Sequence, residues 1–238
     1  MGIFFYVSNV LQTESLRIPP RVIFRRKYLM NSYITHDATG KSVLIDSLTA
    51  NNEDFLLDGV KDLSKILLTH GHSDHIGSAF KVASRTGATV YASELERNHM
   101  MKGTGDIPPF SEIFLVNDTL SLLRPYIKSQ QQAIYEGPVE VVHDGDVVAG
   151  SGIRVVSTPG HTDGSVTFIV TSTRDCFIGD LLRGGLLSGN YASWPFMFKS
   201  KPQILAGIQR IKKDCDVFYP GHGFPFNSTA LDAFLKSL

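Results

Sequence analysis

Four short apolar segments of this chain each lead into a glycine-containing turn that carries histidine or aspartate. Short apolar runs bounded by turn residues are typical of buried strands, and strand ends that share one edge of a sheet lie close together, where binding sites are built. We therefore expect one sheet edge to gather the polar side chains of these turns. The segments are residues 66–68, 153–156, 176–178 and 217–219, and the turns after them hold His70, His72, Asp74 and His75, then His161, then Asp180, then His222.

The most concentrated of these turns spans residues 69–77 and reads THGHSDHIG, with three of the eight histidines of the chain. His70 and His72 are two positions apart, so in an extended segment they point to the same side. Asp74 and His75 then direct a second pair toward a neighbouring position. Neutral imidazoles bind zinc, iron and similar ions, and a carboxylate such as that of Asp180 can bridge two ions. The pattern predicts two metal ions that hold a hydroxide between them.

The rest of the sequence indicates an α/β chain. Strands are expected over residues 22–36 and 41–47, as an antiparallel hairpin, and within 139–180 and 216–225. Residues 66–93 predict a strand–helix–strand unit with its helix over 75–87, and further helices are expected over 52–63 and 202–214, the last with Ser200 as its N-cap. Residues 94–136, with a helix bent at Pro125, predict an inserted cap within one domain spanning 1–238, because so short a block cannot bury its own core.

Composition excludes several classes of protein. The chain is 42% hydrophobic and 19% charged, which is typical of a folded globular protein. Lys+Arg and Asp+Glu are both 23, so the basic footprint of a nucleic-acid-binding protein is missing. No apolar run reaches the roughly 18 residues of a membrane helix, and the first residues lack the basic region of a signal peptide. We expect a cytoplasmic protein that acts on a small molecule, with no membrane partner.

The chain has two cysteines, Cys176 and Cys215, and each lies in an apolar, strand-like run. We expect buried free thiols, which suit a reducing compartment. A disulfide between the two stays open from sequence alone.

The motifs HxHxDH, PGHTDGSV, FIGD and YPGHG follow one another in this order. Together they resemble the metallo-β-lactamase-fold hydrolase superfamily, over about residues 30–226. The resemblance implies a four-layer αββα sandwich with mixed sheets, and it implies that Asp46, at an early strand end, supports the site from behind. The implied ligands are His70, His72 and His161 for a first metal ion and Asp74, His75 and His222 for a second, with Asp180 bridging both.

The resemblance further implies a metal-dependent hydrolase that acts on a small ester, thioester or lactone, with Asp74 as the catalytic residue that orients the hydroxide. A carboxylate at the position of Asp180 resembles the metal site of glyoxalase II. Zinc β-lactamases differ at this position, so the residue argues against antibiotic hydrolysis. The segment after His222 is too short for the glutathione-binding region of glyoxalase II, so a different substrate is expected. Two divalent ions are implied, with zinc expected first and iron or manganese as alternatives.

Other functions fit the same motifs. A persulfide dioxygenase would use a single iron, and a phosphodiesterase or nuclease of this fold would keep the same ligands. A metal-stabilised module without catalysis is disfavoured, because it needs no second ligand set.

The glycine-rich loop after Asp180 supplies candidate substrate contacts, with a packed loop as the equal alternative for each. The remaining histidines are expected to have surface or hydrogen-bonding roles. The candidate contacts are Arg183, Tyr191 and Trp194, and the remaining histidines are His36, His99 and His143.

Overall fold

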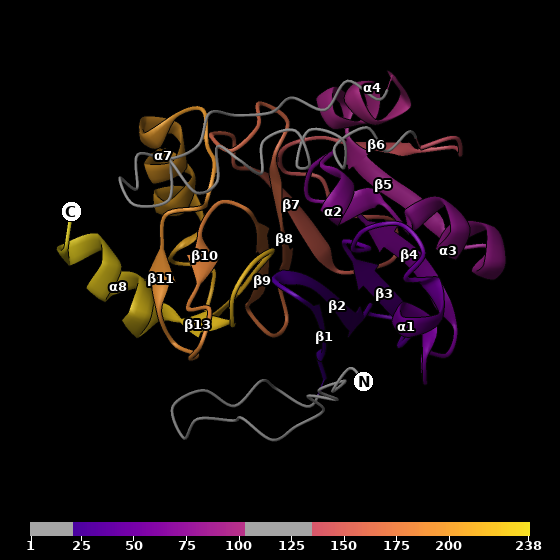
Figure 1. The fold of residues 1–238 in the computed structure, drawn as a ribbon, viewed down its shortest axis with the longest axis horizontal. Coiled ribbons are helices and arrows are strands. Elements are labelled where there is room, and N and C mark those ends of the chain that lie inside the picture. Colours follow the sequence, from indigo (N-terminus) through magenta and orange to yellow (C-terminus); the bar gives the residue numbers. More distant parts are fainter. Residues whose placement is uncertain (1–20, 103–134) are drawn as a thin grey trace, which may run out of the picture.

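A computed structural model describes residues 21–102 and 135–238 of the chain. Two mixed β-sheets lie face to face, with helices on both outer faces (Figure 1). The expected αββα sandwich is therefore confirmed. The beginning of the expected cap forms α4 (Glu94–Lys102). Residues 1–20 and the rest of the expected cap over 103–134, including Pro125, lie outside the described residues.

The first sheet has the strand order β1-β2-β3-β4-β5-β6. β1, β2 and β3 are antiparallel neighbours, as the early hairpin pattern predicts, whereas β3 to β6 run parallel. Parallel strands end at the same edge of a sheet, so Asp46 after β3 and His70 after β4 lie at one edge. The strands are β1 (Ile23–Lys27), β2 (Met30–His36), β3 (Ser42–Ile45), β4 (Leu63–Leu67), β5 (Thr89–Ser93) and β6 (Glu140–Val142).

The second sheet has the strand order β13-β12-β9-β8-β7. Its parallel pair is β9 and β12, so Asp180 after β9 and His222 after β12 also meet at one edge. A small hairpin of β10 and β11 lies within the glycine-rich loop that follows Asp180. The strands are β7 (Ile153–Ser157), β8 (Val166–Val170), β9 (Asp175–Gly179), β10 (Arg183–Gly184), β11 (Ala192–Ser193), β12 (Val217–Pro220) and β13 (Phe226–Asn227).

Buried side chains alternate between the two faces of each sheet. In β2, Tyr33 packs between the sheets and Ile34 packs under the outer helices, and in β9, Phe177 and Ile178 divide in the same way. Because both faces are apolar, such strands read as continuous apolar runs. The first sheet is covered by α1 (Glu53–Leu57), α3 (Ala79–Thr86) and α4, and the second by α7 (Lys201–Ile211) and α8 (Ser228–Lys236).

The helix bounds differ in part from the sequence prediction. The helix expected over 52–63 ends at Leu57, and Gly59, at φ 69°, turns the chain toward β4. The helix expected over 75–87 is divided into α2 (Ser73–Ile76) and α3, where Gly77 lies so close to the backbone of residues 49–50 that a Cβ would be 2.4 Å from Ala50 N. At α7 the prediction holds, since Ser200 accepts a hydrogen bond from the Gln203 N–H as its N-cap.

The expectation of free thiols is wrong, because Cys176 and Cys215 form a disulfide. β9 and β12 are parallel neighbours, so Cys176 lies beside Phe218 while Cys215 precedes β12 at the same end. The two Cα atoms are 5.7 Å apart although 39 positions separate the residues in sequence. The thiol argument for a reducing compartment is therefore removed, and a cytoplasmic location stays a prediction. Within residues 21–102 and 135–238, no helix is both long and apolar enough to cross a membrane.

Candidate metal centre

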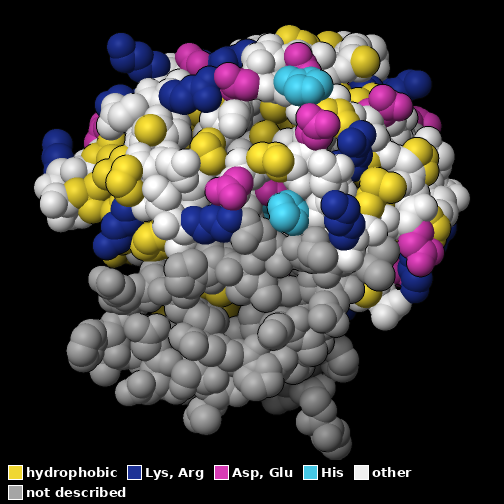
Figure 2. Space-filling view, turned by 90° about the horizontal axis from the view of Figure 1, so that it is seen from above, with side chains coloured by type: hydrophobic (Ala, Val, Ile, Leu, Met, Phe, Trp, Pro, Cys, Tyr) yellow, Lys and Arg dark blue, Asp and Glu magenta, His cyan; other side chains and the backbone are white. Residues whose placement is uncertain are grey.

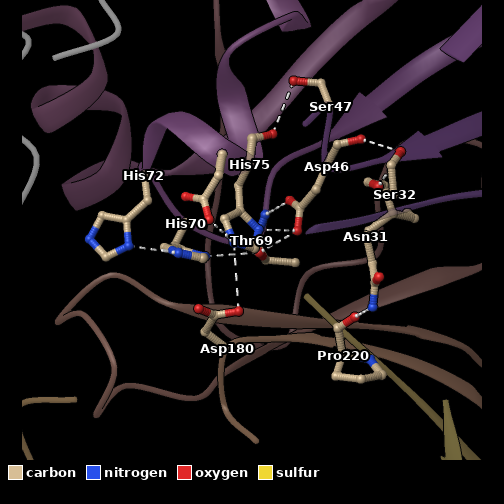
Figure 3. A network of polar contacts seen from close by, with 12 residues as sticks. Asn31, Ser32, Asp46, Ser47, Thr69, His70, His72, His75, Asp180 and Pro220 are labelled. Carbon is tan, nitrogen blue, oxygen red and sulfur yellow. Dashed lines mark hydrogen bonds and ion pairs between the residues drawn. The ribbon is translucent and has the colours of Figure 1, made fainter. Parts of the chain in front are cut away.

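All seven side chains named from the strand ends meet at the seam between the two sheets. Figure 3 shows four of them, His70, His72, His75 and Asp180, directed toward one another. The first sheet contributes the turn after β4 and helix α2, and the second contributes the turns after β7, β9 and β12. Within each group below, the ligand-type atoms lie within 4.8 Å of one another. The groups are His70, His72 and His161; His70, His75 and Asp180; and Asp74, His75 and His222.

The first group places three buried imidazole nitrogens at nearly equal spacing. His72 Nδ1 lies 3.1 Å from His70 Nε2 and 3.0 Å from His161 Nε2, and the last two atoms are 3.2 Å apart. Nitrogens bound to zinc at about 2.0–2.1 Å in a tetrahedral site lie about 3.3 Å apart, so this spacing fits a metal ion. Burial lowers the pKa of His70 and His72, and it lowers that of His161 to about 4. These imidazoles are therefore neutral at pH 7, the form that binds metal.

The second group combines two imidazoles with a carboxylate. Asp74 Oδ2 lies 3.8 Å from His75 Nε2 and 3.4 Å from His222 Nε2. Asp180 lies between the groups: its Oδ1 is 3.6 Å from His75 Nε2, and its Oδ2 is 3.3 Å from His222 Nε2 and 3.5 Å from His161 Nε2. Asp180 thus has one carboxylate within reach of both groups, which is the arrangement a bridging ligand needs.

Two buried atoms of this centre lack a hydrogen-bond partner in the described part of the chain. They are His75 Nε2 and Asp180 Oδ1, and both face the space between the ligands. A buried polar atom without a partner costs about 1–3 kcal/mol or more. A metal ion would bind both atoms, so these residues fit the metal site that their spacing predicts.

The charges of the second group favour a cation. Burial opposes charge on His75, but Asp74, Asp46 and Asp180 together raise its pKa to about 9. Burial likewise opposes the charged form of Asp180, yet the surrounding histidines, His222 foremost, hold its pKa well below the usual range. Without a metal ion, protons on the imidazoles of this group balance the negative charges of its carboxylates. A divalent ion would supply the same positive charge.

Asp46 lies behind the centre, where the sequence resemblance places it. Its Oδ2 accepts hydrogen bonds from His75 Nδ1 and from the Thr69 hydroxyl, and its Oδ1 accepts one from the Thr69 N–H, each at 2.8 Å (Figure 3). The contact fixes the proton of His75 on Nδ1 and leaves Nε2 directed at the centre. Outer contacts of this kind orient metal ligands and raise their basicity.

Backbone carbonyls orient two further imidazoles in the same way. His161 Nδ1 donates to Met197 O at 2.7 Å, and His222 Nδ1 donates to Leu29 O at 2.8 Å. The His222 turn is held in addition by Asn31, whose side-chain amide donates to the carbonyls of Pro220 and Gly223. Asn31 is not among the residues that the sequence indicates, since it lies about 190 positions away from that turn.

Glu96 is a second residue that the sequence does not single out. It lies in α4, is only 2% exposed, and accepts hydrogen bonds from both turns of the first group. An acidic residue on the buried face of a helix is the sequence signal that could have identified Glu96. It was missed because the sequence assigns this segment to a polar cap.

The three candidate substrate contacts have different surroundings. The Arg183 guanidinium carbon lies 5.1 Å from the centre of the Phe196 ring, and that ring lies 5.6 Å from the His222 ring. Tyr191 is largely exposed. Trp194 packs against Phe234 under the outer helices of the second sheet, which is the environment of a core residue.

The remaining histidines are not among the ligand groups of the centre. In the described ranges, none of them belongs to a group with metal-ligand spacing. His36 ends β2, His99 lies in α4, and His143 is an exposed residue near Asp146.

Comparison with known proteins supports the sequence resemblance. Residues 30–222 match the family model described as the metallo-beta-lactamase superfamily. An uncharacterized protein of Mycobacterium tuberculosis is 31% identical over 185 residues, which cover 71% of each chain. A Methanocaldococcus jannaschii protein described as a probable metallo-hydrolase is 24% identical and covers 82% of this chain and 88% of its own. A metal-dependent hydrolase of Shouchella clausii is 39% identical over 87 residues, covering 35% of this chain and 38% of its own.

Solved structures share the fold. The crystal structure of TTHA1623 in a di-iron-bound form superposes with a TM-score of 0.61 at 24% identity, covering 88% of this chain and 96% of that one. ST1585 from Sulfolobus tokodaii gives a TM-score of 0.64 at 18% identity, covering 88% of this chain and 80% of that one.

Proposed function

The chain belongs to the metallo-beta-lactamase superfamily as a metal-dependent hydrolase, and we propose that it uses two metal ions to cleave a small ester, thioester or lactone. The observation that carries the proposal is the pair of ligand groups that share Asp180. Two divalent ions held there would supply a nucleophile at neutral pH and positive charge for the carbonyl oxygen of the substrate. The first group would hold one ion with three imidazoles, and the second would hold the other with Asp74, His75 and His222.

Asp74 is the residue to which we assign the orientation of the hydroxide. Its side chain is 29% exposed, whereas those of His75 and Asp180 are 0% and 8% exposed, so Asp74 faces the side from which water and substrate arrive. Burial opposes ionisation, but His75 and His222 keep the pKa of Asp74 below its usual range. The residue is therefore a carboxylate at neutral pH, able to bind the second ion and to accept a hydrogen bond from the hydroxide, which fixes the direction of its lone pair toward the carbonyl.

Zinc is the first expectation for the metal, with iron or manganese as alternatives. Mixed nitrogen and oxygen ligands accept all three ions, and availability decides as much as affinity. The fold is shared with TTHA1623, which has been crystallised in a di-iron-bound form, so iron belongs in the first metal screen.

Arg183 is the substrate contact that we retain from the sequence. Its position next to Phe196, on the side of His222, suits recognition of an anionic or carbonyl group several ångströms from the bond that breaks. Tyr191 stays a weaker proposal because it is exposed, and Trp194 is better explained by its packing.

The described surface gives little support to a nuclease. On the face shown in Figure 2, basic and acidic side chains are interspersed over the described residues, without a basic stripe. A nucleic-acid substrate would favour such a stripe along its backbone path.

The experiment combines elemental analysis with a panel of ester, thioester, lactone and phosphodiester substrates. Two zinc ions per chain and cleavage of a carbonyl substrate would support the proposal. One iron per chain with oxygen consumption would instead indicate a persulfide dioxygenase. Cleavage of the phosphodiester alone would indicate a phosphodiesterase or nuclease. Asp180→Ala and His72→Ala should abolish turnover, while His143→Ala, at an exposed histidine, should leave it unchanged. Full activity of Asp180→Ala would refute the shared centre.

A further inference from the structure

Two separate turns supply the first metal group, and one buried carboxylate connects them. His70 and His72 come from the turn after β4, while His161 comes from the turn between β7 and β8. We propose that Glu96 of α4 is the positioning residue that holds these two turns in register, and so sets the affinity of the first metal ion. The inference rests on the proposed metal centre, but it is tested by metal binding rather than by turnover.

The hydrogen bonds of Glu96 divide between the two turns. Its Oε2 accepts from the Gly71 N–H at 2.7 Å, and Gly71 lies between His70 and His72. Its Oε1 accepts from the Thr162 hydroxyl at 2.6 Å and from the Gly164 N–H at 3.1 Å, directly after His161. One rigid carboxylate thus joins both turns, and neither can shift without stretching a hydrogen bond.

The fit around the carboxylate is close on both sides. A Cβ at Gly71 would lie 2.8 Å from Glu96 Oε2, and a Cβ at Gly164 would lie 2.6 Å from Oε1. Only glycine permits this approach, so these two positions of the HxHxDH and PGHTDGSV motifs are explained by the side chain that lies against them.

The contacts of Glu96 call for a side chain that accepts hydrogen bonds through both of its oxygens. All of its contacts in the described chain are donors, and it has no ion pair with Lys or Arg there. An ionised carboxylate only accepts hydrogen bonds, whereas a glutamine amide has one accepting oxygen and one donating nitrogen. Glu96→Gln must therefore set an N–H group against either Gly71 N–H or the Thr162–Gly164 donors. The nearby negative charge also favours a cation among the imidazoles, since Glu96 is one of the charges that act on His72.

The test separates the two metal groups with variants that each lack a ligand. In a His222→Ala background the first group is complete, and in a His161→Ala background the second retains its own ligands. Zinc affinity is measured in each by competition with a chromophoric chelator. Loss of an outer contact typically weakens metal binding about 10–100-fold, so we expect that loss on adding Glu96→Gln to the His222→Ala protein. Less than a threefold change is expected in the His161→Ala protein.

A matched control comes from the same helix. Glu94→Gln makes the same chemical change at a side chain that is 61% exposed and forms an ion pair with Arg97 on the surface, so it should alter neither affinity. Glu96→Asp, which keeps the charge but shortens the reach, should weaken the first group less than Glu96→Gln does.

The melting temperature of each metal-free variant distinguishes positioning from general stability. Equal weakening of both groups, in step with a lower melting temperature, would overturn the proposal in favour of a purely structural Glu96. Unchanged zinc affinity in the His222→Ala background would overturn it as well. Neither result would bear on whether the loaded protein is a hydrolase.

Discussion

Gly221 offers a sharp steric test of the metal centre. It lies in the turn between β12 and His222, and a Cβ at this position would be 2.4 Å from both Asp180 Oδ1 and His75 Cε1. The backbone of Gly221 is not in the left-handed region, so alanine is compatible with its conformation. The nearest contacts that Gly221→Ala introduces are therefore with the two proposed ligands.

The expected magnitude follows from those two distances. Nonbonded carbon atoms prefer a separation of about 3.5–4.0 Å, so the new methyl group must displace its neighbours by about 1 Å. Because it meets Asp180 and His75 together, movement of one side chain does not relieve the clash. Misplacement by about 1 Å can lower the rate about 100-fold, and overpacking costs about 1–3 kcal/mol of stability.

The assay compares kcat/KM, metal content per chain and urea unfolding for the wild type and Gly221→Ala. We expect about 100-fold lower kcat/KM and a second ion that binds more weakly than the first, since the His161 group is not contacted. Gly207→Ala is the matched control: it lies inside α7, its nearest new contact is 3.2 Å, and alanine is favoured in helices. Wild-type activity together with full metal content in Gly221→Ala would refute the placement of this turn.

Three further predictions concern the surroundings of the ligands. Asp46→Asn replaces an acceptor of His75 and should weaken metal binding about 10–100-fold in chelator competition; unchanged affinity would contradict the role of Asp46. Burial opposes charge on His75 and His222, but nearby carboxylates raise the pKa of His75 to about 9 and hold that of His222 well above its usual value, so both residues are protonated at neutral pH when no metal is bound. Binding of the second ion must displace both protons, so its affinity should rise by up to about 100-fold per pH unit from pH 6 to 8. Calorimetry that detects no proton release at pH 7 would exclude this coupling. Finally, Cys176→Ser with Cys215→Ser opens a loop closed over 39 positions and should lower the free energy of unfolding by about 4 kcal/mol; equal urea midpoints with and without reductant would argue against the bridge.

The residues of the proposed metal centre were accessible to sequence reasoning because each follows a short apolar strand. His161, Asp180 and His222 come from separate strands, yet each stands where its strand ends, and strand ends share an edge. Local rules also predicted the N-cap at Ser200, since capping depends on neighbours a few positions away.

The features that sequence reasoning missed depend on contacts between distant segments. Glu96 acts through backbone N–H groups that carry no side-chain signal. The disulfide depends on β9 and β12 being parallel neighbours, which the strand patterns do not specify. The break between α2 and α3 arises from Gly77 against the backbone of residues 49–50 rather than from helix propensity.

The seam between the two sheets makes the proposed metal ions part of the architecture. The group around His72 needs His161 from the opposite sheet, and the group around Asp74 needs His222. Each bound ion would therefore act as a cross-link between the two halves of the sandwich, and each tenfold excess of free metal over its dissociation constant would add about 1.4 kcal/mol to stability. A change of that size can alter the abundance of a protein several-fold in a cell. The abundance of the protein would then depend on the metal supply, so metal depletion would lower the amount of folded protein as well as its activity.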